Sequence, residues 1–223
     1  MFSRKNVAPL VAEALGTAIL TFSVLAITRS AIGIPYFIAV GVGLTLVLIV
    51  ATLGATSGAH VNPAVTIGAW TLRKIKTLDA LLYIIAQFAG AAAALRLYMY
   101  LTNRPIQNIA NETFDWRVVA AEVAGTFVFT FGIAAATYQK FSPGKTALTI
   151  GGSLGLGVLV AGVASNGMLN PAVALGAQSW SMAYAAAPIV GSVVGMNVYA
   201  LLFAGEKLSL VPATKKKAAK RKR

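Results

Sequence analysis

Two short stretches of this chain, His60-Val61-Asn62-Pro63-Ala64-Val65 and Leu169-Asn170-Pro171-Ala172-Val173, carry the same Asn-Pro-Ala motif between apolar residues. Asn is a favoured helix N-cap and Pro suits the first helical turn, so each motif predicts the start of a helix. We expect each helix to run about ten residues, through Trp70 and Trp180, and to rise about 15 Å, half of a hydrocarbon core. Such segments would enter a membrane without crossing it, and would meet near its midplane if they entered from opposite faces.

The composition indicates an integral membrane protein. Of the 223 residues, 57% are hydrophobic and 11% are charged, and the mean hydropathy is +0.75. A transmembrane helix needs about 20 mostly apolar residues, and such stretches lie at about 8–28, 35–55, 78–101, 117–138, 145–164 and 182–204. The predicted fold class is an all-α membrane protein with six transmembrane helices and two re-entrant half-helices, and a β-barrel is excluded. Because the chain has no cysteine, a thiolate metal site is excluded, and we expect neither a metal nor a cofactor.

The net charge of +13 is distributed as a membrane topology requires. If both termini are cytoplasmic, fifteen basic residues face inward and three face outward, as the positive-inside rule expects. The inner set is Arg4, Lys5, Arg73, Lys74, Lys76, Lys140, Lys145, Lys207 and seven residues of the tail, and the outer set is Arg29, Arg104 and Arg117. We therefore predict a multi-pass protein of the cell (plasma) membrane with cytoplasmic termini, and no nucleic-acid partner.

The chain is a tandem repeat. An Ala-Glu-x-x-Gly-Thr pattern occurs at Glu13 and again at Glu122, and the two Asn-Pro-Ala motifs, at Asn62 and Asn170, recur at nearly the same offset. Two independent motifs at nearly one offset indicate duplication. We place repeat one at about 8–101, repeat two at about 117–204 and a basic cytoplasmic tail at 205–223, all in a single channel-like domain. Three spans in each repeat invert the second copy in the membrane.

These residues resemble the aquaporin (major intrinsic protein) family over about residues 8–204. The resemblance is carried by Ser57-Gly58-Ala59-His60-Val61-Asn62-Pro63-Ala64-Val65-Thr66, by the second Asn-Pro-Ala motif and by the Ala-Glu-x-x-Gly-Thr repeats. It implies a six-span bundle, a pore in each protomer, a homotetramer and no enzymatic activity. It also implies that Glu13 and Glu122 brace the two loops. The carbonyls implied to line the pore are those of Gly58, Ala59, His60, Gly167, Met168 and Leu169.

The chemistry expected at the two motifs is passive conduction. Asn62 and Asn170 can each donate a hydrogen bond to a passing water, beside the positive N-terminal ends of the two half-helices. That arrangement repels cations and interrupts a proton-conducting chain of water. Two other interpretations remain open. Glu13 and Glu122 are intramembrane carboxylates that can serve a proton relay, and His60, the only histidine, can serve a pH gate.

The outer selectivity filter departs from the family pattern. Counting along that pattern places the filter at Val42, Val158, Gly167 and Val173. Most members carry Arg where Val173 stands, and Ala174 stands where glycerol-selective members carry Asp. A filter without charge or aromatic ring should be wider and more apolar than a water-selective one, although an apolar constriction can also conduct poorly by dewetting.

Three further features are peripheral. Arg96, near the outer end of the third span, is expected to reach the lipid headgroups, with replacement of the missing filter charge as the alternative. The basic tail predicts attraction to anionic lipid. Asn111-Glu112-Thr113 is a glycosylation sequon, relevant only to a eukaryotic source.

The sequence thus leaves three functional hypotheses. The first is a passive channel for water, with small uncharged solutes as further permeants. The second is a broad facilitator for neutral solutes such as glycerol, urea and ammonia. The third is a non-conducting structural membrane protein with the same fold. The partners expected are water or such solutes, the lipid bilayer and further copies of the chain in a homotetramer.

Overall fold

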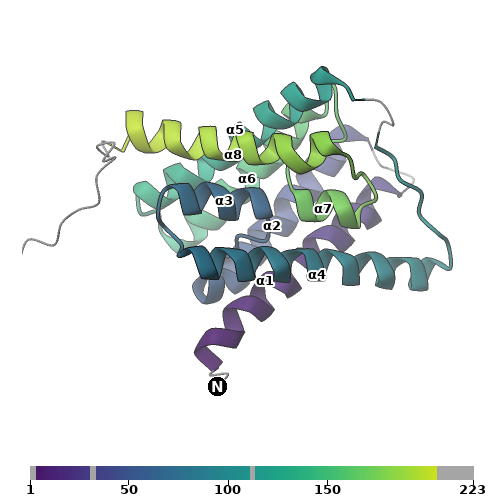
Figure 1. Cartoon of the computed structure of the whole chain (residues 1–223), viewed down its shortest axis with the longest axis horizontal. Coiled ribbons are helices and arrows are strands. Elements are labelled where there is room, and N and C mark those ends of the chain that lie inside the picture. The colour runs from purple at the N-terminus through teal and green to yellow at the C-terminus, as the bar shows by residue number, and fades with distance from the viewer. Residues whose placement is uncertain (1–3, 31–33, 111–113, 205–223) are drawn as a thin grey trace, which may run out of the picture.

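The computed structural model describes residues 4–30, 34–110 and 114–204, and this part of the chain is helical. Figure 1 shows its helices, which are α1 (Arg4–Thr28), α2 (Pro35–Ser57), α3 (Pro63–Thr71), α4 (Thr77–Thr102), α5 (Trp116–Tyr138), α6 (Pro143–Ala161), α7 (Pro171–Gly176) and α8 (Met182–Leu202). The sequon at Asn111 and the basic tail lie outside the described residues.

Six of these helices are long and apolar enough to cross a membrane, as the sequence predicts. They are the stretch Val7–Thr28 of α1 and the whole of α2, α4, α5, α6 and α8. The predicted spans agree with them to within about three residues at each end, the usual uncertainty of a helix boundary. The all-α fold class is confirmed.

The two repeats pack in the same way and interlock. Helix α1 packs on α4 in repeat one, α5 packs on α8 in repeat two, and α2 and α6 join the repeats. The short helices α3 and α7 lie end to end between α4 and α8 (Figure 1). Each short helix packs on both of these long helices, so each repeat holds the half-helix of the other.

The contact between α2 and α6 depends on glycines at equivalent repeat positions. A Cβ atom on Gly43 would lie 2.8 Å from the carbonyl oxygen of Gly151, and one on Gly155 would lie 2.9 Å from that of Ala39. Both distances are too short for a real side chain, so only glycine lets the two backbones approach this closely. Gly43 and Gly151 are equivalent in the same alignment of the repeats that pairs Asn62 with Asn170.

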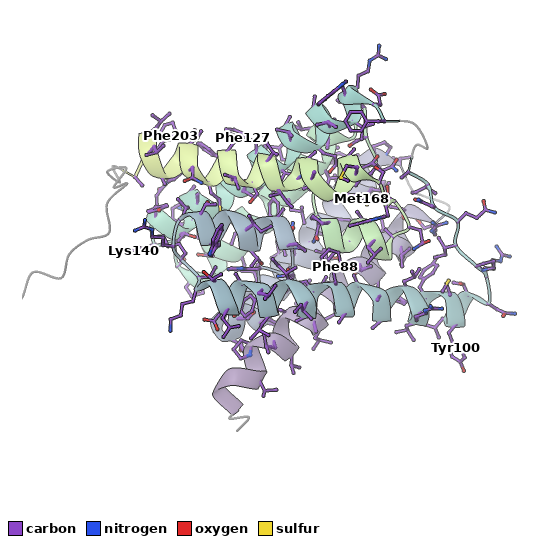
Figure 2. The ribbon with its side chains drawn as sticks, in the orientation of Figure 1. Phe88, Tyr100, Phe127, Lys140, Met168 and Phe203 are labelled. Atoms are coloured by element: carbon purple, nitrogen blue, oxygen red, sulfur yellow. The ribbon has the colours of Figure 1, made fainter. Side chains whose placement is uncertain are left out.

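Basic residues gather at one end of the helix bundle. The Nζ atom of Lys74, in the link from α3 to α4, lies 4.5 Å from the ring centre of Tyr138. The Nζ atom of Lys145 lies 3.7 Å from the ring centre of Phe141, in the link from α5 to α6. Figure 2 shows Lys140 at this end and Tyr100 at the opposite end. The arrangement agrees with the predicted separation of the charges.

The second half-helix is shorter than predicted. Helix α3 runs past Trp70 to Thr71, but α7 ends at Gly176 and does not reach Trp180. Gln178 adopts a left-handed φ of 57°, and the Ser179 N–H donates to the Ala174 carbonyl at 2.8 Å. Together with the Gln178 N–H donating to the Leu175 carbonyl, this is a Schellman termination. Helix α3 ends in the same way, with Arg73 as the left-handed residue.

Candidate functional site

The two Asn-Pro-Ala motifs begin helices, as predicted. Asn62 has extended backbone angles and its Oδ1 accepts the N–H of Ala64 at 2.8 Å. The Oδ1 of Asn170 accepts the N–H of Ala172 at 3.0 Å and that of Val173 at 3.3 Å. Each Asn is therefore a helix N-cap, followed by a proline at the first helical position, where its missing N–H is not needed.

The amide nitrogens of the same two residues cross from one repeat to the other. Asn62 Nδ2 donates to the carbonyl of Leu169 at 2.9 Å, and Asn170 Nδ2 donates to the carbonyl of Val61 at 2.8 Å. Both accepting residues have left-handed backbones, with φ of 43° at Val61 and 52° at Leu169. This conformation is costly for a β-branched residue such as Val. It turns the two carbonyls toward the opposite Asn residues.

Glu13 fixes the first loop from α1. Its Oε1 accepts the Ser57 hydroxyl at 2.6 Å and the His60 N–H at 2.9 Å. Its Oε2 accepts the Val61 N–H at 2.6 Å and the Gln87 amide at 2.8 Å. The Glu13 side chain is fully buried, so these donors supply the hydrogen bonds that water would otherwise make.

Glu122 fixes the second loop from α5 in the same way. Its Oε1 accepts the Ser165 hydroxyl at 2.7 Å and the Met168 N–H at 3.0 Å, and its Oε2 accepts the Leu169 N–H at 2.7 Å. Figure 2 shows Met168 beside the start of α7. Among the described residues, no glutamine donates to Glu122 as Gln87 donates to Glu13. Each glutamate thus joins its loop to the long helix that carries it through several hydrogen bonds.

Two tyrosines that were not predicted from the sequence also hold the loops. The hydroxyl of Tyr83 in α4 donates to the Ser57 carbonyl at 3.0 Å. The hydroxyl of Tyr184 in α8 accepts the Asn166 N–H at 3.0 Å. The two lie at different spacings from their motifs, because the second repeat has a shorter half-helix and because Tyr184 lies nearer the start of α8 than Tyr83 lies to the start of α4. A tyrosine in the long helix that follows each motif is the signal that could have found them.

A cavity of about 30 Å³, which we call the outer cavity because it holds the residues predicted for the outer filter, lies against both Asn residues. It has room for about one or two water molecules. All four predicted filter residues line it, together with His60, Val61, Met168 and several apolar side chains. The structure therefore brings Val42, Val158, Gly167 and Val173 to one cavity, and none of them is charged or aromatic.

A second cavity of about 480 Å³, which we call the inner cavity, is lined in part by the first loop. Gly58, Ala59 and His60 line it, as does Val65, which follows the first motif. Leu169 lines neither cavity, and its carbonyl is occupied by Asn62. Of the predicted carbonyl ladder, the second loop therefore brings only Gly167 and Met168 to a cavity wall. The motif residues Pro63, Ala64, Pro171 and Ala172 are buried in the helix starts.

Arg96 does not replace the missing filter charge. Its side chain is exposed on α4 and lines neither cavity. The position agrees with the expectation that Arg96 reaches the headgroups.

The chain matches the family model for the major intrinsic proteins over residues 1–203. It belongs to the major intrinsic protein family. Among curated members it is 31% identical to aquaporin Z of Photorhabdus laumondii, over 87% of this chain and 97% of that protein. It is 34% identical to a probable aquaporin TIP1-1 of rice, over 80% of this chain and 72% of that protein.

A solved structure shows the same fold. The X-ray structure of the aquaglyceroporin from Plasmodium falciparum matches with a TM-score of 0.73, covering 90% of this chain and 98% of that one. At 20% identity this likeness concerns the fold alone. This major intrinsic protein is therefore an integral, multi-pass membrane channel for water or small solutes and not an enzyme.

Proposed function

We propose that this channel conducts water passively, through the outer and inner cavities and past Asn62 and Asn170. One observation carries the proposal, the reciprocal hydrogen bonds of the two Asn amides. Each Nδ2 carries two protons and gives one to the opposite loop. Because both Asn residues line the outer cavity, the second proton of each can be donated to a water there.

The electrostatics support conduction of neutral molecules. The N-terminal ends of α3 and α7 carry positive partial charge, which disfavours cations beside the two Asn residues. Helix α3, with nine residues, contributes more than α7, with six. A water that accepts from the Asn amides cannot also pass a proton along a continuous chain.

The direct test is an osmotic jump on proteoliposomes. We expect faster volume change than in protein-free vesicles, and a rate equal to theirs would refute the proposal. The cysteine-free chain offers a clean control for the route. A Val42→Cys variant should lose its water flux on treatment with a thiol-directed mercurial, because the modified side chain fills the outer cavity, while the unmodified parent chain should be unaffected.

A second permeant class is favoured by the filter composition. Val42, Val158, Gly167 and Val173 offer no charge and no aromatic ring to reject a neutral solute. Uptake of glycerol, urea and ammonia into the same vesicles tests this broader facilitator. The third hypothesis, a non-conducting structural protein, would be supported by an intact oligomer that passes none of these permeants.

The assembly and orientation that we propose follow from the charge and the family. We propose a homotetramer in the plasma membrane. Both termini, and the end of the bundle that holds Lys74 and Lys145, face the cytoplasm in this proposal. Native mass spectrometry measures the subunit number. Protease access to a C-terminal tag in intact cells and in inverted vesicles measures the orientation.

A further inference from the structure

Three side chains line both the outer and the inner cavity. Leu46 from α2, His60 from the first loop and Phe129 from α5 line both of them. On one side lies a volume of about 30 Å³ and on the other about 480 Å³. We call Leu46, His60 and Phe129 the junction ring. A molecule that moves from one cavity to the other must pass between them.

The junction ring breaks the symmetry of the repeat. In the alignment that pairs Glu13 with Glu122, the counterpart of Phe129 is Leu20, and Leu20 lines the outer cavity only. In the alignment that pairs the two Asn-Pro-Ala motifs, the counterparts of Leu46 and His60 are Leu154 and Met168, which also line only the outer cavity. The aromatic ring and the imidazole thus both lie on the inner side of the Asn pair.

The hydrogen bonds around His60 determine which nitrogen the ring offers to a permeant. The Thr66 hydroxyl has one proton, which it donates to the Asn62 carbonyl at 3.0 Å. One lone pair of its oxygen accepts the Gln87 amide at 3.0 Å. The other lone pair can accept a proton from His60 Nδ1, at 3.2 Å. We therefore assign the ring proton to Nδ1.

The other nitrogen, Nε2, is then an acceptor. A Cβ atom on Gly58 would lie 3.5 Å from it, and Gly58 belongs to the wall of the inner cavity. Leu46 and Phe129 are apolar and can make no hydrogen bond with a permeant. A water in the ring can donate to His60 Nε2 and keep a hydrogen bond to a neighbouring water. A larger solute with several hydroxyls would lose more of its hydrogen bonds at this point.

We propose that the junction ring, and not the valine filter, is the rate-limiting barrier and the size limit of this channel. The inference rests on the proposed function, because it concerns the same pore. Phe129 is the bulkiest side chain of the junction ring. Phe129→Leu replaces it with leucine, the residue type of its repeat counterpart Leu20. If that change lowers the barrier by about the net worth of one hydrogen bond, the flux rises about fivefold.

The experiment compares water and glycerol flux in proteoliposomes of equal protein content for the parent chain, Phe129→Leu, Leu46→Ala and Val173→Ala. We expect Phe129→Leu and Leu46→Ala to raise the water flux several-fold and the glycerol flux by a larger factor, and Val173→Ala to raise both by less. Leu48→Ala is the matched control, because Leu48 lies close to Leu46 on α2 but has 61% of its surface exposed. It should conduct as the parent does.

The outcomes separate the inference from the function on which it rests. If the parent conducts and Val173→Ala raises the flux while both ring variants do not, the barrier lies at the filter and the inference is wrong. The inference is equally wrong if no variant differs from a conducting parent. If the parent and every variant match protein-free vesicles, the proposed function fails as well. Size-exclusion profiles and unfolding temperatures confirm that each variant is folded, and Phe129→Met replaces Phe129→Leu if that variant is not.

Discussion

Asn62 and Asn170 each hold the loop that carries the other. Their amide nitrogens reach the carbonyls of Leu169 and Val61 at 2.9 Å and 2.8 Å, while their amide oxygens cap their own helices. Each side chain thus joins a half-helix start in one repeat to the last residue before the motif in the other. The two repeats are therefore tied together at the point that we propose as the pore centre.

Replacing Asn62 with alanine should reduce both stability and water flux. The loss of the cap costs about 1 kcal/mol, and the Leu169 carbonyl left without its donor costs about 1–3 kcal/mol more. We expect a lower unfolding temperature in detergent and a lower rate in the osmotic assay. Asn108→Ala is the control, since Asn108 also makes hydrogen bonds, with Ala110 and Trp180, but lies in an exposed loop outside both cavities. Equal effects of the two variants would contradict the central role of Asn62.

The two glutamates should differ in how much they stabilise the fold. A glutamine at either position replaces one accepting oxygen with an N–H₂ group, which cannot accept from the loop donors. Each donor left without an acceptor lowers the free energy of unfolding by about 1–3 kcal/mol. Glu13 accepts from four donors and Glu122 from three, the difference being Gln87. We expect Glu13→Gln to lower the unfolding temperature more than Glu122→Gln.

A double-mutant cycle identifies the source of that difference. In a Gln87→Met background, where one donor has been removed, the effect of Glu13→Gln should become smaller. The effect of Glu122→Gln should stay the same, because Gln87 does not contact Glu122. A cycle in which Gln87→Met leaves the Glu13→Gln effect unchanged would exclude this explanation.

Adjacent glycines in α6 should respond in opposite ways to alanine. A Cβ atom on Gly151 would lie 2.5 Å from the Gly43 carbonyl oxygen, whereas one on Gly152 would meet no atom within 4 Å. We expect Gly151→Ala to destabilise the bundle by about 1–3 kcal/mol through overpacking. Gly152→Ala should be neutral or stabilise by up to about 1 kcal/mol, because alanine favours the helix. The unfolding temperatures of the two variants test this prediction. A similar loss of stability in both would mean that α2 and α6 do not approach as closely as these distances require.

The tautomer assigned to His60 can be read directly, because it is the only histidine of the chain. Nitrogen NMR of protein labelled at the imidazole should show a protonated Nδ1 and an unprotonated Nε2. Thr66→Val removes the acceptor of the Nδ1 proton and should change the Nδ1 signal. A protonated Nε2 in the unmodified chain would remove the proposed acceptor from the junction ring.

Much of the fold was predictable because its signals are local or repeated. Hydropathy locates the spans, and the recurrence of Glu13 and Glu122 reveals the duplication. The end of α7 was predicted incorrectly because Trp180 follows the second motif much as Trp70 follows the first. Helix α7 ends at the left-handed turn at Gln178. Glycine or asparagine usually occupies this position, so a glutamine does not predict the turn.

The candidate site was predictable only where a motif marks it. The filter positions were located by counting along the family pattern, and they do line one cavity. Phe129 and Leu46 carry no such mark, since an apolar residue in an apolar helix gives no sign of facing a pore. Their place at both cavities depends on how α2, α5 and the first loop converge, which only the three-dimensional arrangement shows.

Introducing arginine at the filter should separate the effects of charge and bulk. Val173 follows the second Asn-Pro-Ala motif and is almost fully buried at the wall of the outer cavity. A fixed positive charge there would repel cations, so Val173→Arg should reduce any proton or cation leak of the parent channel, measured with a pH-sensitive dye under an imposed voltage. It should also reduce glycerol uptake by narrowing the cavity.

Val173→Met adds bulk without charge and should reduce glycerol uptake alone. If methionine suppresses the leak as strongly as arginine, the effect is steric. If the parent shows no leak, the half-helix ends and the Asn pair exclude protons without a filter charge.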